Sequence, residues 1–120
     1  MRALDADRFQ EGQQVFKYAV RRMSELACQL LERNGLSSRD LALVVPHQAN
    51  LRIIRAMQER LGVDDSKIMV NIDRFGNTSA GTLPILIDEQ MRGGQLKHGD
   101  LCMLLALGAG VHWGCALVRW

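Results

Sequence analysis

Three short segments of the chain carry the residue types that could do chemistry. His47 lies in PHQAN (46–50), Asn77 lies in NIDRFGNTSAG (71–81), and a glycine-rich segment covers residues 108–110. A neutral imidazole and a side-chain amide can both donate hydrogen bonds to a ligand carbonyl, and glycine lets backbone N–H groups come close to a ligand. The combination favours a site that stabilises negative charge developing on an oxygen atom.

Each segment also has a purely structural interpretation. A histidine before a helix can be a capping or surface group, Asn77-Thr78-Ser79 can cap a helix, and the glycine segment can be a tight turn. A dinucleotide-binding loop does not fit residues 108–110, because a predicted strand follows them where a helix is required. A metal site would need two of His47, His98 and His112 together, and their spacing gives no ligand pattern.

The elements that must position these segments alternate between helices and strands. Apolar spacing predicts helices at 15–34, 50–61 and about 78–91, and apolar runs predict strands at 41–45, 67–71, 100–108 and 112–120. The last two strands are separated only by Ala109, Gly110 and Val111, so we expect an antiparallel hairpin. The sequence therefore predicts an α/β fold with a mixed, mostly parallel sheet and crossover helices.

The three segments share one position relative to these elements, because each follows the carboxyl end of a predicted strand. Ligands bind at that edge in open α/β sheets, so the segments are expected to converge on one site. Residues 1–14 are polar and are predicted to be a linker or a short strand preceding a single domain.

Composition narrows the classes of partner. The net charge is +2 and aromatic residues make up 5% of the chain, which argues against a stacking platform for nucleic acid. No apolar run approaches 18 residues, so we expect no membrane span. Cys28, Cys102 and Cys115 lack paired spacing and lie in apolar surroundings, which is typical of reduced cysteines in a cytoplasmic protein.

Taken together, the segments are far more specific than they are singly. PHQANLRII, NIDRFGNTSAGTLP and LALGAGVHWGCALVRW resemble, in that order and spacing, the C-terminal half of β-ketoacyl-acyl carrier protein synthase III, a thiolase-like condensing enzyme. The similarity extends upstream to EGQQVFKYAV and covers nearly all 120 residues. The resemblance implies the C-terminal half of the thiolase fold over residues 1–120, with the half that carries the catalytic cysteine absent.

The resemblance implies a decarboxylative Claisen condensation. A cysteine takes an acyl group from acyl-CoA, and the carbanion formed from malonyl-ACP attacks it to give a 3-oxoacyl-ACP at the start of fatty acid synthesis. His47 and Asn77 match the histidine and asparagine that hold the malonyl thioester carbonyl. Gly108, Ala109 and Gly110 match the glycine-rich loop at the acyl thioester. No metal and no cofactor beyond the two substrates is implied.

Partners follow from the same resemblance. Arg52 matches an arginine that docks the acidic acyl carrier protein, and Arg55 shares its helix face; a solvated helix face is the alternative interpretation. None of the cysteines matches the family nucleophile, so the other half, or a second chain, is expected to supply it. The complete protein is expected to be a cytoplasmic homodimer, with no nucleic-acid or membrane partner.

Two other functions stay open at this point. One is a non-catalytic module that binds a carrier protein or an acyl group, and the other is a related condensing enzyme of polyketide or quinolone synthesis. The sequence also departs from the expected pattern at a few positions, which leave the chemistry in place and the acyl substrate open. These positions are Gly81, Thr82, Leu107 and His112.

Overall fold

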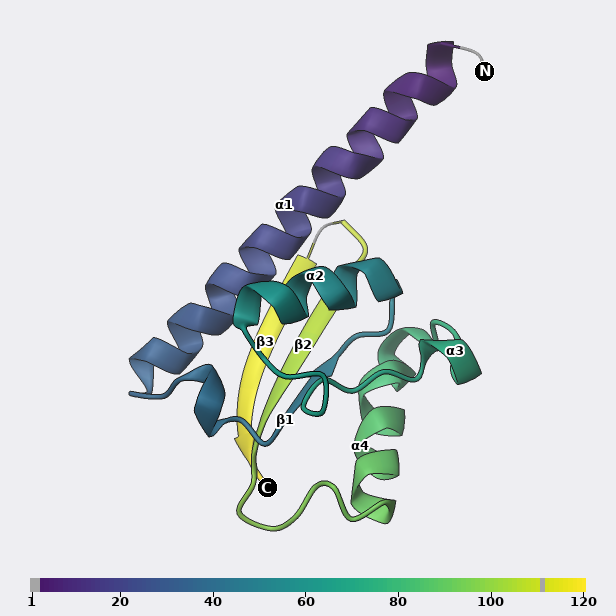
Figure 1. Cartoon of the computed structure of the whole chain (residues 1–120). Helices are drawn as coiled ribbons and strands as arrows, with labels where there is room; N and C mark the ends of the chain where they lie inside the picture. Colours follow the sequence, from purple (N-terminus) through teal and green to yellow (C-terminus); the bar gives the residue numbers. More distant parts are fainter. Residues whose placement is uncertain (1–2, 111) are drawn as a thin grey trace.

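The computed structural model describes residues 3–110 and 112–120, and its elements form layers on the two faces of a small sheet (Figure 1). The helices are α1 (Ala3–Arg33), α2 (Leu51–Leu61), α3 (Ile72–Phe75) and α4 (Thr82–Arg92). The strands are β1 (Leu43–Pro46), β2 (Leu101–Gly108) and β3 (His112–Arg119). Short 3-10 helices are η1 (Ser38–Asp40) and η2 (Ser79–Gly81).

The sheet has the order β1-β2-β3. β1 runs parallel to β2, with Leu43 opposite Cys102, and β3 runs antiparallel to β2, with His112 opposite Gly108. These pairings confirm the predicted α/β class, the mixed sheet and the final hairpin. Val111, part of the predicted turn, lies outside the described residues.

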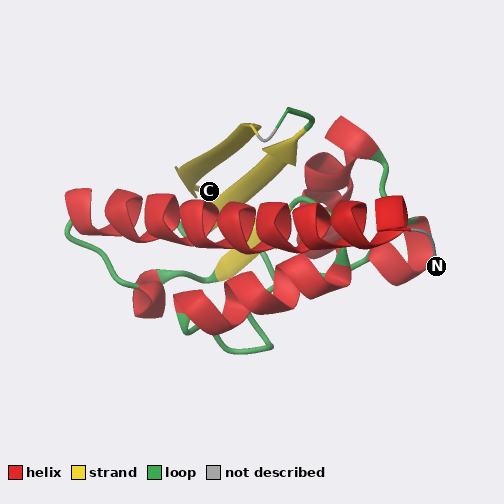
Figure 2. Ribbon diagram, turned by 90° about the horizontal axis from the view of Figure 1, so that it is seen from above, coloured by secondary structure: helices red, strands yellow, loops and turns green. Residues whose placement is uncertain are grey.

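Side chains alternate between the two faces of the sheet, as the pleat of a strand requires. Val44 and Met103 belong to the larger apolar cluster, which α1 and α2 cover. Leu43 and Val45 point to the smaller cluster, where Leu86 of α4 packs. Figure 2 shows α1 and α2 lying side by side, and the two helices are in contact. The strand ends between these layers are therefore held from both faces.

The predicted strand at 67–71 is wrong, because the segment makes only one bridge to the sheet. Ile68 pairs with Val44, supported by hydrogen bonds from Val44 N–H to Lys67 O (2.7 Å) and from Met69 N–H to Val44 O (2.9 Å). Beyond this point the N–H groups of Asn71 and Ile72 bond to a side chain instead of a strand. Pairing stops there, and the chain turns into α3.

The prediction that residues 1–14 are a linker or strand is also wrong from residue 3 onward. α1 begins at Ala3 and continues without a break to Arg33. Polar composition does not oppose a helix, because Glu, Gln and Arg have good helix propensity and the segment contains no proline. Residues 1 and 2 lie outside the described residues.

The predicted helix at about 78–91 is divided. Ser79 has φ 54° and begins η2, and the regular helix α4 starts only at Thr82. Pro84 is the third residue of α4, where its missing N–H has no intrahelical partner to lose. Gly62, with φ 63°, ends α2 as the sequence predicts.

Candidate active site

A pocket of about 460 Å³ lies at the carboxyl ends of β1 and β2. His47 follows β1, Asn77 and Thr82 flank η2, and Gly108 and Ala109 end β2 and begin its turn; all of them line the pocket. Side chains and backbone from three distant segments thus meet at one edge of the sheet. The fold brings them together because α4 packs on β1 while β2 lies beside it.

Gly110, the third residue of the predicted glycine loop, is not among the pocket-lining residues. It has φ 75°, a conformation that L side chains rarely adopt. A Cβ added there would lie 3.1 Å from the ring of His112. The same ring places its Nδ1 2.8 Å from Ala109 O. Gly110 therefore shapes the turn, while Gly108 and Ala109 face the pocket.

His47 is fixed at both its backbone and its ring. Its N–H donates to Leu105 O at 2.7 Å, and its Nδ1 lies 2.7 Å from Oγ1 of Thr82. Burial lowers the pKa of His47 below its ordinary value of 6.5, because desolvation disfavours the charged ring. The ring is therefore neutral at pH 7 and can donate from one nitrogen only.

Asn77 is exposed, and its amide is oriented by a local hydrogen bond. Its Oδ1 accepts from the N–H of Ser79 at 2.9 Å, which assigns the oxygen to the inner side of the turn. The NH₂ group is thereby the part of the amide left for a ligand. The capping and the binding interpretations therefore involve different atoms of Asn77. Its Oδ1 stabilises the turn, and its NH₂ group is available to a ligand.

Gln48 is a residue whose role sequence reasoning missed. Its side chain is fully buried, with 0% exposure. Its Nε2 donates to Pro46 O (2.9 Å) and Met69 O (3.3 Å), and its Oε1 accepts from Asn71 N–H (2.9 Å) and Ile72 N–H (3.1 Å). Gln48 therefore ties the loop of His47 to the loop of Asn77. The signal in the sequence was the amide side chain of Gln48 itself, because it directly follows an apolar strand and a buried amide must find hydrogen-bond partners.

Asn50, and not His47, caps α2. The Asn50 side chain accepts from Arg52 N–H at 2.8 Å. This arrangement removes the interpretation of His47 as a helix cap, because its ring nitrogen contacts Thr82, 35 positions away.

A polar network holds the second loop against α4. Asn71 Nδ2 donates to Glu89 at 3.1 Å, and Arg74 pairs with the same carboxylate. The Arg74 hydrogen bond and then that of Asn71 lower the pKa of Glu89. The segment that presents Asn77 is thus anchored just before α3 and within it.

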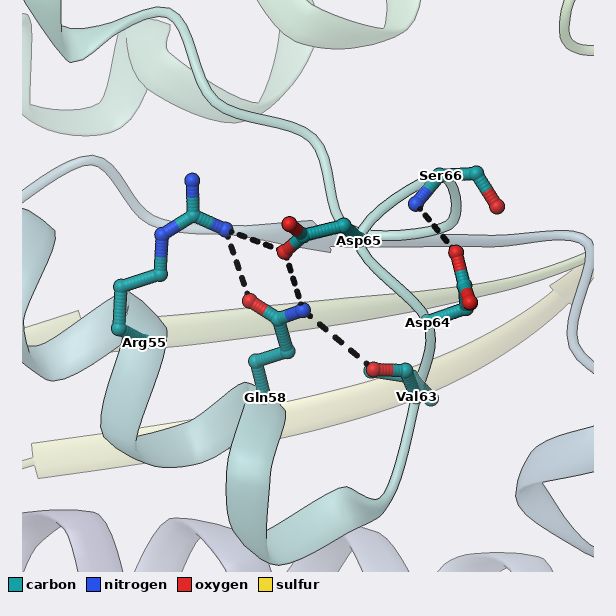
Figure 3. A network of polar contacts seen from close by, with 6 residues as sticks. All are labelled: Arg55, Gln58, Val63, Asp64, Asp65 and Ser66. Atoms are coloured by element: carbon teal, nitrogen blue, oxygen red, sulfur yellow. Dashed lines mark hydrogen bonds and ion pairs between the residues drawn. The ribbon is translucent and has the colours of Figure 1, made fainter.

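The two arginines predicted to dock a partner differ in their surroundings. The Arg52 guanidinium lies 5.2 Å from the centroid of the Phe16 ring. Arg55 pairs with Asp65 at 2.9 Å and donates to Gln58 at 2.8 Å, and Figure 3 shows this network on the surface of α2. The charge of Arg55 is therefore partly balanced by a neighbouring carboxylate.

A second, apolar cavity of about 380 Å³ adjoins the pocket. It lies between α1, α2 and the end of β2, and Phe16, Ile53, Leu107 and Gly108 are among its lining residues. Leu107 and Gly108 also line the pocket of His47. An elongated ligand could therefore reach the polar pocket along an apolar wall.

Two of the three cysteines, Cys102 and Cys115, have surroundings that suppress thiolate formation. Burial raises the pKa of Cys102 and of Cys115 to about 11. Within residues 3–110 and 112–120, no three His, Cys, Asp or Glu side chains gather as a metal site would require. No helix in the same ranges has the length and apolar character needed to cross a membrane.

Comparison with known families bears on what this pocket is. Residues 31–120 match the family described as 3-oxoacyl-[acyl-carrier-protein (ACP)] synthase III C terminal. The chain belongs to this family. The β-ketoacyl-[acyl-carrier-protein] synthase III of Chlorobium luteolum is 50% identical over 112 residues, which are 93% of this chain and 34% of that protein. The chain thus spans about a third of the length of the curated relatives that it matches.

Solved structures of family members have the same fold. The 3-oxoacyl-[acyl-carrier-protein] synthase III of Aquifex aeolicus is 44% identical with a TM-score of 0.87, and the match covers 91% of this chain and 35% of that one. The priming β-ketosynthase of the R1128 polyketide biosynthetic pathway is 34% identical with a TM-score of 0.82, covering 89% and 32%. These matches confirm the predicted family and its thiolase-like fold.

Proposed function

We propose that this chain supplies the histidine and asparagine of a 3-oxoacyl-ACP synthase III, which condenses acyl-CoA with malonyl-ACP to initiate fatty acid synthesis. The observation that carries the proposal is the shared pocket of His47, Asn77, Gly108 and Ala109. Family membership and the names of the relatives support the same reaction.

In this proposal the two donors act on the malonyl thioester. Loss of CO₂ breaks the bond between the carboxylate carbon and the α-carbon, and the electron pair moves onto the α-carbon and the thioester oxygen as an enolate. Asn77 donates from its NH₂ group, since its Oδ1 accepts from Ser79 N–H, and His47 donates from a ring nitrogen. Donors aimed at a developing oxyanion are each worth about 2.7–4 kcal/mol.

The acyl group is expected on a cysteine outside these residues. The enolate carbon attacks its thioester carbonyl, and the thiolate leaves. We propose that a backbone N–H of the Gly108–Gly110 loop serves the oxyanion of that second step, because Gly108 and Ala109 line the pocket. The raised pKa of Cys102 and Cys115 supports an external nucleophile, because only a thiolate takes up the acyl group.

The partners in this proposal are acyl-CoA and an acyl carrier protein. The adjoining apolar cavity leaves room for the arm of a thioester, and Arg52 and Arg55 present positive charge on α2 near its wall. We propose that Arg52 contributes more to docking than Arg55, whose charge Asp65 partly balances. A homodimeric, cytoplasmic enzyme without a metal or further cofactor completes the proposal.

A second candidate function has one observation in its favour, the polyketide priming ketosynthase among the solved neighbours. The condensation chemistry is the same, and the two candidates differ in the acyl group. A non-catalytic module is the third candidate, and nothing at the pocket favours it, because both donors are present.

The decisive experiment is a chimera in which this chain replaces the matching third of the Chlorobium luteolum synthase. Malonyl-ACP decarboxylation by the chimera should fall about 10²–10³-fold in His47→Ala and in Asn77→Ala, because each removes an oxyanion donor. His98→Ala is the matched histidine control, since His98 is exposed and contacts Trp120 O at 3.1 Å.

The outcomes separate the candidates. Equal rates in the unsubstituted chimera and both alanine variants would falsify the assigned roles. A folded chimera without activity, beside an active parent enzyme, supports the non-catalytic module. A panel of acetyl-, branched and longer acyl-CoA substrates then distinguishes fatty acid initiation from polyketide priming.

A further inference from the structure

Thr82 is a buried polar residue that the proposed reaction does not yet use. Its side chain is 1% exposed, although it opens α4 at the wall of the pocket. Its Oγ1 lies 2.7 Å from Nδ1 of His47 and 3.0 Å from the carbonyl oxygen of Ser79. A hydroxyl has one hydrogen, so it can donate to only one of these two acceptors at a time.

The choice of acceptor fixes which nitrogen of His47 carries the proton. If the hydroxyl donates to Ser79, then Nδ1 must be the protonated nitrogen and Nε2 is left as an acceptor. If the hydroxyl donates to Nδ1, the neutral ring carries its hydrogen on Nε2 and can donate to a ligand. Only the second arrangement produces the donor that the enolate needs.

The distances favour the second arrangement. Hydrogen bonds from O–H to oxygen are most often about 2.7–2.8 Å long, and those from N–H to oxygen about 2.9–3.0 Å. The 3.0 Å contact with Ser79 O is at the long end for a hydroxyl donor, and Ser79 O already accepts from the backbone N–H of Thr82, so the hydroxyl can donate to Nδ1 at 2.7 Å. Within the described residues, Thr82 is also the one hydrogen-bond partner of Nδ1.

The local backbone explains why the hydroxyl is available. Ser79 adopts φ 54°, its N–H donates to Asn77 Oδ1, and its carbonyl accepts from the backbone N–H of Thr82, so the carbonyl does not depend on the hydroxyl. The same turn therefore orients the amide of Asn77 and the hydroxyl that meets His47. The lowered pKa of His47 agrees with a neutral ring, which can accept at one nitrogen and donate at the other.

We propose that Thr82 is a positioning residue that sets the tautomer of His47, donating its hydroxyl to Nδ1 so that Nε2–H faces the substrate oxygen. This inference rests on the proposed function for its catalytic consequence, and on the contacts alone for the tautomer. Serine at position 82 keeps the hydroxyl that donates to Nδ1, whereas valine has nearly the same shape as threonine and lacks the hydroxyl.

The first test reads the tautomer without any turnover. The chimera is labelled with ¹⁵N-histidine, and the His47 resonances are identified by their loss in His47→Gln. We expect an unprotonated Nδ1 and a protonated Nε2 above pH 7. Thr82→Val should shift the ring toward the other tautomer or a mixture, and Thr82→Ser should restore it. A protonated Nδ1 in the unsubstituted protein overturns the proposal, even if Thr82→Val does not fold.

The second test reads the catalytic consequence. In Thr82→Val the decarboxylation kcat should fall about three- to tenfold with KM little changed, as expected for one hydrogen bond that selects the tautomer, and Thr82→Ser should recover it. A lower kcat with an unchanged tautomer contradicts the proposal and indicates a packing effect. A third outcome separates the two proposals. If Thr82→Val changes the tautomer but His47→Ala leaves the rate unchanged, the role of Thr82 is supported and the proposed function is contradicted.

Discussion

Two polar networks of this chain are built from similar groups and differ in what surrounds them. At the pocket, Gln48 is completely buried and joins two loops 23 positions apart. On the surface of α2, Gln58 joins Arg55 to Asp65, and the side chains of this ion pair are 50% and 79% exposed (Figure 3). The first network is cut off from water, and the second competes with it.

The difference teaches where polar contacts determine geometry. A buried amide with four partners costs free energy whenever one partner is lost, so the loops that present His47 and Asn77 have little freedom. An exposed ion pair exchanges readily with water and salt, so it neutralises charge without fixing a position. The Gln48 network therefore fixes the geometry of the site, and the network of Arg55, Gln58 and Asp65 adjusts the charge on the surface of α2.

The largest expected effect is the loss of the buried amide. Gln48→Leu leaves the N–H groups of Asn71 and Ile72 without their acceptor, and we expect it to destabilise the chain by about 2–4 kcal/mol. Gln58→Leu is the matched control and should change stability by less than about 0.5 kcal/mol. Urea unfolding followed by tryptophan fluorescence measures both. Equal losses would erase the distinction between the networks.

Acidic pH should lower the stability that the partly buried ring of His47 contributes. The folded-state pKa of His47 lies below 6.5, so the stability from its neutral ring is complete above pH 6.5 and is lost as pH falls through the folded pKa. Protonation leaves the hydrogen on Nε2 in place, so the expected consequence of acid is a fall in the free energy of unfolding of the chimera as the pH decreases through the folded pKa.

Urea unfolding of the chimera on both sides of pH 6.5 measures this dependence, and His47→Gln should remove it. A loss of stability whose midpoint lies above pH 6.5 contradicts a ring that burial keeps neutral.

Charge reversal on α2 should have a smaller effect that salt can imitate. Arg52→Glu should slow transfer from malonyl-ACP about fivefold, because one exposed charge pair at contact distance is worth about 1 kcal/mol in water. Arg55→Glu should slow it less, since Asp65 already balances part of its charge. Kinetics with malonyl-CoA should not change in either variant. A larger loss at Arg55 reverses the assignment.

The smallest effect concerns the exposed ion pair itself. A double-mutant cycle with Arg55→Ala and Asp65→Ala should give a coupling below about 0.5 kcal/mol at 0.15 M salt, and less at 1 M. A coupling of several kcal/mol would show that the network of Figure 3 holds the fold as firmly as Gln48 does.

Local signals predicted much of the architecture. The apolar stripe and Gly62 predicted α2 and its end, and adjacent apolar runs predicted the β2–β3 hairpin. Where a tertiary contact overrides local preference, prediction failed: residues 67–71 look like a strand, but Gln48 takes the N–H groups that a neighbouring strand would have used. The helical start of α1 was missed because polar composition was taken as a sign of irregular structure.

The candidate site divides in the same way. The types and order of His47, Asn77 and the glycine segment are readable in the chain, and the position of each after a strand predicts a common edge. Thr82 could be noticed only as a departure from a family pattern, because nothing within its own helix indicates a hydrogen bond to a residue 35 positions earlier.

By itself, the sequence determined which donors this protein carries and which strand ends hold them, because periodicity, caps and turns act over a few neighbouring residues. Only the tertiary structure decided that a threonine on α4 meets a histidine after β1, and that a buried glutamine joins the loop of His47 to the loop of Asn77. Such contacts depend on how helices pack against a sheet, which many distant apolar residues fix together.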